Sequence, residues 1–478
     1  MIEKYIGGRR CAILGLGVSH TPLARLLNQK NISLTVYDGR TAAELGKEAL
    51  ELEKNGVSFV VADKEFDGVE GDIIFRSPGI RPDRRGLLHA VENGAELISE
   101  TELFLKLTPA STYAVTGSDG KTTTTTLVGK FLSEDGGEDS KTYVGGNIGT
   151  PLVTLCPQMS ERDNAVLELS SFQLMTLSDA PQRVAITNVS ENHLDWHTDM
   201  REYVVAKKRI VGERTERLVT NADCAVTADI ALEMSGQDLE IALFSSSRNT
   251  YEDVLGRLCG RPRTTAVYVK DGAIIVDDGN VAVKVLDVSD IQILGKHNVE
   301  NFMTAIALTW QCVAPRIYSQ VARSFFGVEH RLELVRELDG VRFYNSSIDS
   351  SPTRTAAALS AMSGKSLVLI SGGYDKNLDY APLARAIYEH GGVHTLVLTG
   401  ATADKIEAAM TEYRQSAEKG ADVKILRGGD FSAAVELARE SARMGDCVVL
   451  SPASASFDAF KNFMERGNTF KSIVNRFE

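Results

Sequence analysis

Residues 114–126 read Ala-Val-Thr-Gly-Ser-Asp-Gly-Lys-Thr-Thr-Thr-Thr-Thr, and this order predicts a phosphate-binding loop. An apolar strand runs into a turn bounded by Gly117 and Gly120, and Lys121 and Thr122 then open a helix. Such a turn points backbone N–H groups and a helix N-terminus at one place, where a polyphosphate can bind. Lys121 would reach the β- and γ-phosphates, and the Thr122 hydroxyl would bind Mg²⁺. The alternative is a glycine-rich turn with no ligand.

Acidic and imidazole side chains follow two further apolar strands of the same region. Glu168 ends one of these strands, and His193 lies in the loop after the other. If both strands run parallel to the one before the phosphate loop, their ends meet at one sheet edge and suggest a metal–nucleotide site. Two alternatives remain open. Glu168 alone is also typical of a solvated strand-end carboxylate, and His193, Asp195 and His197 form a possible zinc-ligand set.

The composition is that of a globular protein without a membrane span. The 478 residues are enough for about three domains, and 43% are hydrophobic and 24% charged. We see no signal peptide and no apolar run of roughly 18 residues, so we expect a cytoplasmic protein with no membrane partner. Six scattered cysteines without a C-x-x-C pair argue against a zinc ribbon or a disulfide framework. A net charge of −12 argues against a nucleic-acid partner.

Short apolar strands alternate with helical stretches along the whole chain, which predicts an α/β protein of three domains. We expect an N-terminal Rossmann-like domain over 1–100, a central P-loop ATPase-like domain over 101–327 and a C-terminal Rossmann-like domain over 328–478. Each should have a mainly parallel sheet with flanking helices. In the first, a Gly-Leu-Gly turn follows the first strand, but His20 occupies the third glycine of the dinucleotide fingerprint. A redox Rossmann domain is therefore the weaker interpretation.

The chain resembles the Mur ligases along nearly its whole length, and it is most similar to the type that adds D-glutamate to UDP-N-acetylmuramoyl-L-alanine. Seven segments carry the resemblance in order. They are Thr-Gly-Ser-Asp-Gly-Lys-Thr (116–122), Gly-Gly-Asn-Ile-Gly (145–149), Leu-Glu-Leu-Ser-Ser-Phe-Gln (167–173), Ala-Lys-Lys-Arg-Ile (206–210), Gly-Lys-His-Asn-Val-Glu-Asn (295–301), His-Arg (330–331) and Ser-Pro-Ala-Ser-Ala-Ser-Phe-Asp-Ala-Phe-Lys-Asn-Phe (451–463).

The resemblance implies a reaction in two steps. A substrate carboxylate attacks the γ-phosphate of ATP and becomes an acyl phosphate, and the amine of D-glutamate then displaces phosphate to form an amide. Two anions meet in the first step, so the site needs positive charge. The family places catalytic roles on Lys121, Glu168, His193 and Lys207, and two Mg²⁺ sites on Thr122, Glu168, His193 and Lys207. It also implies that Lys207 is carbamylated; the alternative is an ordinary surface lysine beside Lys208 and Arg209.

The resemblance further implies three sets of binding residues. The ATP set is Gly117, Ser118, Asp119, Gly120, Lys121, Thr122, Thr123, Asn301, Arg331 and Ser346. The set for the UDP substrate is Gly15, Leu16, Gly17, Val18, Ser19, Asp38, Arg40, Ser77, Gly79 and Asn147. The D-glutamate set is Ser350, Lys376, Ser456, Phe457 and Phe463.

Two of the departures from the family pattern Asn-Asp-Ser-Lys-Ala-Thr bear on the chemistry. Ser346 replaces an aspartate expected on the ATP ribose, and Ile348 replaces a lysine that stabilises negative charge. We expect a monomer that acts on small molecules. The competing hypotheses are a sister ligase that adds another amino acid, such as L-alanine or a diamino acid, and a non-catalytic nucleotide-binding regulator. A regulator would have lost Lys121, Glu168 or His193, and all three are present.

Overall fold

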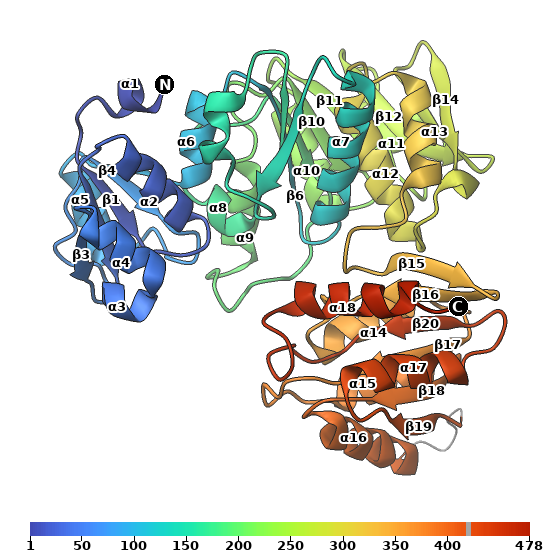
Figure 1. Ribbon diagram of the computed structural model, residues 1–478. Coiled ribbons are helices and arrows are strands. Elements are labelled where there is room, and N and C mark those ends of the chain that lie inside the picture. The colour runs from blue at the N-terminus through green and yellow to red at the C-terminus, as the bar shows by residue number, and fades with distance from the viewer. Residues whose placement is uncertain (417–421) are drawn as a thin grey trace. The chain divides into compact units, whose positions relative to one another are not determined.

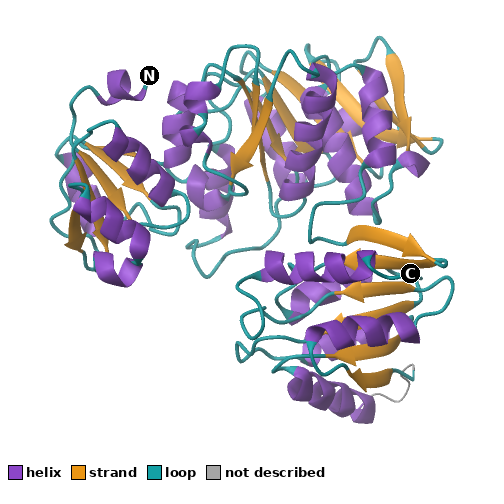
Figure 2. Cartoon of the chain, in the orientation of Figure 1, coloured by secondary structure: helices purple, strands orange, loops and turns teal. Residues whose placement is uncertain are grey.

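The computed structural model describes residues 1–416 and 422–478. Within them, strands gather into sheets that are flanked by helices (Figure 1, Figure 2). The described chain divides into two compact units, one formed by Met1–Asp290 and Lys296–Arg323, the other by Ile291–Gly295 and Ser324–Glu478. Two sheets belong to the first unit and one to the second. The predicted α/β class is confirmed, and the exact domain boundaries stay a prediction.

The first sheet has five parallel strands in the order β3-β2-β1-β4-β5. Its strands are short apolar runs, because helices cover both faces. Leu23 and Leu27 of α2 pack on one face, and Leu87 of α5 packs on the other. The strands are β1 (Cys11–Leu14), β2 (Leu34–Asp38), β3 (Ser58–Val61), β4 (Ile73–Arg76) and β5 (Glu96–Ile98); the helices are α1 (Ile2–Ile6), α2 (His20–Gln29), α3 (Ala42–Leu45), α4 (Lys47–Lys54), α5 (Arg85–Glu92) and α6 (Glu100–Leu107).

The second sheet has nine strands in the order β14-β13-β12-β11-β10-β9-β6-β8-β7. Its strands run parallel except for β13 and β14, which pair antiparallel at one edge. The strands are β6 (Ser111–Thr116), β7 (Thr142–Gly146), β8 (Asn164–Glu168), β9 (Arg183–Ile186), β10 (Arg217–Asn221), β11 (Glu240–Ser245), β12 (Thr264–Lys270), β13 (Ala273–Asp277) and β14 (Ala282–Asp287).

Two helices of this region pack directly against each other. The threonine run at 122–126 lies in the first turns of α7, where the side chains of Thr124 and Thr125 are buried. Phe131 of α7 lies 6.1 Å from Phe302 of α12, ring centre to ring centre. The helices are α7 (Lys121–Gly136), α8 (Ser171–Leu174), α9 (Met200–Lys208), α10 (Ala225–Met234), α11 (Tyr251–Leu255), α12 (Lys296–Thr309) and α13 (Pro315–Ser324), with 3-10 turns η1 (Leu152–Thr154), η2 (Cys156–Gln158), η3 (Gly256–Leu258) and η4 (Val288–Asp290).

The third sheet has six strands in the order β15-β16-β20-β17-β18-β19, parallel except for β15 at its edge. Apolar residues of α14, α15 and α16 cover one face, and those of α17 and α18 cover the other. The strands are β15 (Glu333–Leu338), β16 (Val341–Asn345), β17 (Leu367–Ser371), β18 (Val393–Leu398), β19 (Lys424–Arg427) and β20 (Cys447–Leu450); the helices are α14 (Pro352–Ala361), α15 (Ala381–His390), α16 (Ala403–Ser416), α17 (Phe431–Ser441) and α18 (Phe463–Asn475).

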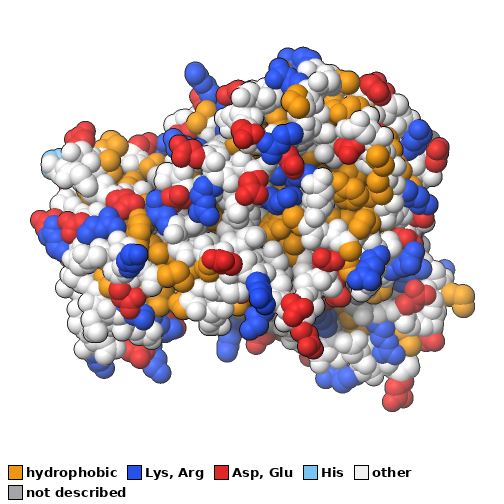
Figure 3. Space-filling model, turned by 90° about the horizontal axis from the view of Figure 1, so that it is seen from above, with side chains coloured by type: hydrophobic (Ala, Val, Ile, Leu, Met, Phe, Trp, Pro, Cys, Tyr) orange, Lys and Arg blue, Asp and Glu red, His pale blue; other side chains and the backbone are white. Residues whose placement is uncertain are grey.

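The surface carries charges of both signs. On the face drawn in Figure 3, Lys and Arg side chains are interspersed with Asp, Glu and hydrophobic side chains. All six cysteines are free. Among the described residues, every helix is too short or too polar to cross a membrane.

Candidate functional site

The predicted phosphate loop lies at the end of β6, the third strand from one edge of the nine-stranded sheet (Figure 1). It follows β6, whose neighbours are β8 on one side and β9 on the other. All three strands are parallel, so their carboxyl ends meet at one edge of the sheet. Glu168 ends β8, and Asn188 follows β9 after one further residue. The structure thus brings the loop and both strand ends together, as the sequence predicts.

Two glycines of the loop lie where no other residue fits. Gly117 has a φ of 150°, and a Cβ on it would lie 1.9 Å from Oγ1 of Thr187. Gly120 has a φ of 80° and precedes α7, and a Cβ there would lie 2.3 Å from Oδ1 of Asn301. Both positions need the left-handed region and close approach that glycine alone tolerates. Asn301, one of the predicted ATP residues, therefore lies directly against the loop.

The loop is held by bonds from its own lysine and from the strand beside it. Nζ of Lys121 donates to the carbonyl oxygens of Gly117 at 3.0 Å and Ser118 at 2.9 Å. Oδ1 of Asn188 accepts from the backbone N–H of Asp119 at 3.0 Å. These bonds keep the lysine charge over the loop, where a bound polyphosphate needs it.

Glu168 is buried, and one of its carboxylate oxygens is satisfied while the other is not. Its side chain is 2% exposed. Nδ2 of Asn147 donates to Oε1 at 2.8 Å, whereas Oε2 has no hydrogen-bond partner among the described residues. A buried carboxylate oxygen without a donor is costly unless a cation binds it. The alternative of a solvated strand-end carboxylate is therefore wrong, and the oxygen fits a Mg²⁺ ligand.

Lys207 is a buried lysine at the end of α9. Its side chain is 1% exposed, and Nζ donates to the carbonyl oxygen of Gly117 at 2.7 Å and lies 4.4 Å from the ring centre of Tyr203. Burial, followed by the nearby charge of Lys121, lowers the pKa of Lys207 to about 6. The alternative of an ordinary surface lysine is therefore wrong. Oγ of Ser118 lies 3.0 Å from the Tyr203 hydroxyl, so the aromatic ring ties the helix to the loop.

Burial lowers the pKa of His193, and the charges of Lys121 and, less strongly, Lys207 lower it further. The backbone of His193 has a φ of 56°, which is uncommon outside glycine and often marks functional sites. His197 instead contacts Ser171 through Nε2 at 2.9 Å and Glu202 through Nδ1 at 3.2 Å. No three His, Cys, Asp or Glu side chains of the described residues are grouped to hold a metal, so the zinc alternative is unsupported.

The predicted residues for the UDP substrate lie at the carboxyl ends of β1, β2 and β4, which are neighbours in the first sheet, except for Asn147, which follows β7 of the second sheet. Oδ2 of Asp38 accepts from the backbone N–H of Leu16 at 3.0 Å, and Oδ1 accepts from Nε of Arg40 at 3.1 Å. A Cβ on Gly15 would touch the side chain of Ser77 at 3.4 Å. His20, which replaces the third glycine, lies 2.9 Å from the Gly15 carbonyl oxygen through Nδ1 and stabilises the turn.

Sequence reasoning missed Arg76, which is fully buried at the end of β4. Its Nη1 donates to the Pro78 carbonyl oxygen at 3.2 Å, and Nη2 donates to that of Phe172 at 2.7 Å. Nε1 of Trp196 also donates to the Gly79 carbonyl oxygen at 3.3 Å. The Arg76–Phe172 and Trp196–Gly79 bonds join the predicted UDP loop to the region that carries Glu168. A charged residue at the end of an apolar strand was the one available signal.

In the second unit, the predicted D-glutamate residues lie on loops at the carboxyl ends of β16, β17 and β20. Nζ of Lys376 lies 5.4 Å from the ring centre of Phe457, which is 58% exposed. Ser456 is buried beside it. The backbone N–H of Ser350 donates to the Ile348 carbonyl oxygen at 2.8 Å. A lysine over an exposed aromatic ring leaves a cation accessible to an anionic ligand.

Ser346 is buried, and its hydroxyl already accepts a hydrogen bond. The side chain is 1% exposed, and Oγ accepts from the backbone N–H of Leu332 at 3.2 Å. This bond holds the turn that carries Arg331, whose side chain is exposed. Ser346, the residue predicted at the ATP ribose, is thus buried. Its hydroxyl bonds to the backbone of the 330–332 turn.

Helix α18 organises these loops through two residues that sequence reasoning missed. Arg466 is 2% exposed; its Nη2 donates to the Ser347 carbonyl oxygen at 2.8 Å, and its Nη1 donates to that of Ala455 at 3.0 Å. A Cβ on the next residue, Gly467, would lie 2.2 Å from Nδ1 of His330. The predicted residue Phe463 begins the same helix, and its carbonyl oxygen accepts from Oγ of Ser347 at 2.7 Å.

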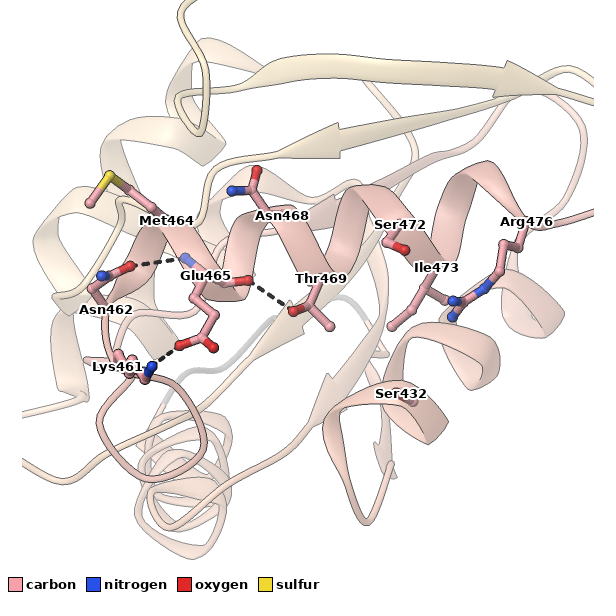
Figure 4. Close-up of a pocket in the computed structure, with 10 residues that line it drawn as sticks. All are labelled: Ser432, Lys461, Asn462, Met464, Glu465, Asn468, Thr469, Ser472, Ile473 and Arg476. Carbon is pink, nitrogen blue, oxygen red and sulfur yellow. Dashed lines mark hydrogen bonds between the residues drawn. The ribbon is translucent and has the colours of Figure 1, made fainter.

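A groove runs along the other side of α18, next to Ser432 of α17 (Figure 4). Polar and charged side chains line it, and Glu465 accepts from the backbone N–H of Lys461 at 2.7 Å at its end. None of the predicted substrate residues lines the groove, so it does not belong to the candidate site.

A phosphate loop beside a buried strand-end carboxylate and a buried lysine defines an enzyme that acts on a nucleoside triphosphate. The profile of the Mur ligase middle domain matches residues 115–309, and that of the Mur ligase glutamate ligase domain matches residues 330–454.

Relatives and solved structures agree with these profiles. The UDP-N-acetylmuramoylalanine--D-glutamate ligase of Ruminiclostridium cellulolyticum is 45% identical, covering 99% of this chain and 98% of that protein. The protein of the same name from Clostridium perfringens is 40% identical over the same shares. The crystal structure of UDP-N-acetylmuramate-alanine ligase from Thermotoga maritima has a TM-score of 0.56 at 15% identity, covering 98% of this chain and 99% of that one, and supports the fold.

The chain belongs to the Mur ligase family, and within it to the UDP-N-acetylmuramoylalanine--D-glutamate ligases. It is therefore an ATP-dependent ligase of peptidoglycan precursor synthesis. This family assignment confirms the resemblance seen in the sequence. It also excludes the redox Rossmann alternative and the non-catalytic regulator.

Proposed function

We propose that this chain joins D-glutamate to UDP-N-acetylmuramoyl-L-alanine through an acyl phosphate, with the residues of the phosphate-loop edge in the first step. The observation that carries the proposal is the group formed at one loop by the half-buried Lys121 and the buried Glu168 and Lys207. Lys121 and the loop N–H groups bind the β- and γ-phosphates of ATP and hold the γ-phosphate for attack.

Mg²⁺ is the metal that this donor set fits. Oε2 of Glu168 is a buried acceptor without a donor among the described residues, and the Thr122 hydroxyl lies on the first turn of α7. We assign a first ion to Thr122 and Glu168, and a second to His193 and Lys207. When bound, these ions neutralise phosphate charge and so favour transfer of the phosphoryl group.

Lys207 suits Mg²⁺ as a ligand only after modification, because an ammonium repels a cation and Mg²⁺ prefers oxygen ligands to a neutral amine. Its burial beside Lys121 favours the neutral amine, which is the form that reacts with CO₂. Carbamylation converts the amine into a carboxylate-like anion. The positive charge of Lys121, which makes an ammonium at Lys207 costly, favours a carbamate there.

The second step uses the loops of the C-terminal sheet. The amine of D-glutamate attacks the acyl phosphate carbon, the C–O bond to phosphate breaks, and the amine loses a proton as the amide forms. Lys376 is the cation for a substrate carboxylate, with Ser350, Ser456 and Phe457 as its neighbours. Asp38, Arg40 and the turn at Gly15 bind the UDP group, and Asn147 the muramoyl group.

We further propose that the chain works as a monomer in the cytoplasm. Its substrates are small molecules, and each predicted substrate residue comes from this one chain. Six free cysteines fit a reducing compartment. Light scattering of the purified protein tests the monomer directly.

A phosphate-release assay with ATP, Mg²⁺ and UDP-N-acetylmuramoyl-L-alanine tests the function. We expect release with D-glutamate and little with L-alanine or a diamino acid. A site built to pair two carboxylates leaves buried polar groups unpaired when one carboxylate is missing. Preference for L-alanine or a diamino acid would overturn the D-glutamate assignment and leave the ligase assignment standing.

A further inference from the structure

The loop after β16 lacks the cation that its family pattern leads one to expect. It reads Asn-Ser-Ser-Ile-Asp-Ser over 345–350, so Ile348 stands where lysine is common and Asp349 where alanine is common. The amino-acid substrate carries two carboxylates, and Lys376 is one cation. A second cation near Ser350 would pair the second carboxylate, because an anion removed from water needs a charged partner.

Arg354 places a positive charge beside the changed positions. It lies on the first turn of α14, and its side chain is exposed. Nη1 donates to the Ile348 carbonyl oxygen at 3.2 Å, and the backbone N–H of Ser350 donates to the same oxygen at 2.8 Å. Across the part of the chain that the structure describes, this is the one hydrogen bond of the guanidinium. A guanidinium has five N–H donors, so enough remain for a carboxylate.

The new acidic residue at 349 complements that charge. Asp349 is buried, and its Oδ2 accepts from Oγ of Ser451 at 2.8 Å. The charges of Arg331 and Arg354 both act on this carboxylate. A fixed negative charge inside the loop favours a guanidinium that stays at the loop. Arg354 thus supplies a positive charge close to Ile348, where the family pattern has lysine, and to Asp349, where it has alanine.

We propose that Arg354 replaces the cation missing at Ile348 and binds a carboxylate of the incoming amino acid beside Ser350. This proposal rests on the D-glutamate activity proposed above. It makes Arg354 a residue that determines specificity in this chain, with Lys376 as the second cation of the pair.

Arg354→Gln is the decisive variant. The glutamine amide retains an N–H donor for the Ile348 carbonyl oxygen but has no charge, so it separates a structural role from an electrostatic one. We expect the KM for D-glutamate to rise on the order of tenfold or more, with the KM values for ATP and the UDP substrate nearly unchanged. Arg385→Gln is the matched control, because Arg385 is an exposed arginine on α15 that pairs with Glu389.

Adding Ile348→Lys to the Arg354→Gln variant should recover most of the lost affinity for D-glutamate, because it returns a cation to the same loop. An unchanged D-glutamate KM in Arg354→Gln would overturn the proposal, and so would a loss confined to kcat. Should Arg354→Gln lack the parent's thermal transition, Arg354→Ala takes its place. Failure of the proposed function is distinct, since the unmodified enzyme would then release no phosphate with D-glutamate.

Discussion

Nζ of Lys207 donates to the carbonyl oxygen of Gly117 at 2.7 Å, so a buried lysine from the end of α9 contacts the first glycine of the phosphate loop. These residues are 90 positions apart in the chain. The contact explains why a helix lysine bears on ATP chemistry. It also places Nζ of Lys207, the proposed carbamylation site, against the loop that we propose binds phosphate.

The first prediction concerns that lysine. Lys207→Ala should be nearly inactive, and millimolar acetate should partly restore activity by replacing the missing carboxylate-like ligand. Lys208→Ala is the control, because Lys208 pairs with Glu233 on the exposed side of the same helix. Intact-protein mass spectra in bicarbonate buffer should show the added carbamate in the parent and not in Lys207→Ala. An unmodified lysine in the active parent would end the carbamate proposal.

Lys121 is the subject of the second prediction. Lys121→Ala removes the charge that neutralises the β- and γ-phosphates and should lower kcat on the order of 10²-fold or more. The measurement is phosphate release at saturating ATP and Mg²⁺. Lys130→Ala, on the same helix but beyond the loop, should retain most of the activity. Near-normal turnover in Lys121→Ala would contradict the phosphate-loop assignment.

Gly467 gives a prediction about stability. Gly467→Ala places a Cβ 2.2 Å from Nδ1 of His330 and 3.1 Å from Nδ2 of Asn345. The helix must then shift away from the loops, and we expect a loss of about 1–3 kcal/mol in the free energy of unfolding. Urea denaturation measures it, with Asn468→Ala on the exposed side of the helix for comparison. Equal stability of the two variants would show that α18 does not pack as tightly as described.

Glu100 gives a prediction about pH. It is buried in α6, and burial raises its pKa from 4.5 to about 7. The folded state therefore binds a proton that the unfolded state has lost between pH 4.5 and 7, so this carboxyl lowers stability progressively as pH rises through that window. Glu100→Gln removes the effect.

The free energy of unfolding of Glu100→Gln, relative to that of the parent, should therefore increase between about pH 5 and pH 8 by up to about 3 kcal/mol. Urea denaturation at both pH values measures the change, and Glu92→Gln on the exposed surface should show none. The same stability difference at both pH values would refute the prediction.

Several elements of the site were predictable because they are local. A strand, a glycine turn and a Gly-Lys-Thr ending lie within a dozen residues, so the phosphate loop can be predicted without knowledge of the fold. The apolar runs of the sequence at 11–14, 33–37, 184–187, 341–344 and 447–450 end within one residue of β1, β2, β9, β16 and β20. Apolar runs between polar turns are typical of buried parallel strands, and this explains the agreement.

The sequence by itself determined the family, the α/β class and the chemistry of the loop, since these depend on residue types at short spacing. The tertiary structure excluded a surface lysine at Lys207 and a solvated carboxylate at Glu168, because burial depends on elements far apart in the chain. It alone revealed Arg76 and Arg466, whose guanidinium groups bind carbonyl oxygens of distant loops. A charged residue in an apolar segment needs polar partners when it is buried. The sequence does not show which groups these are, and only the folded structure identifies them.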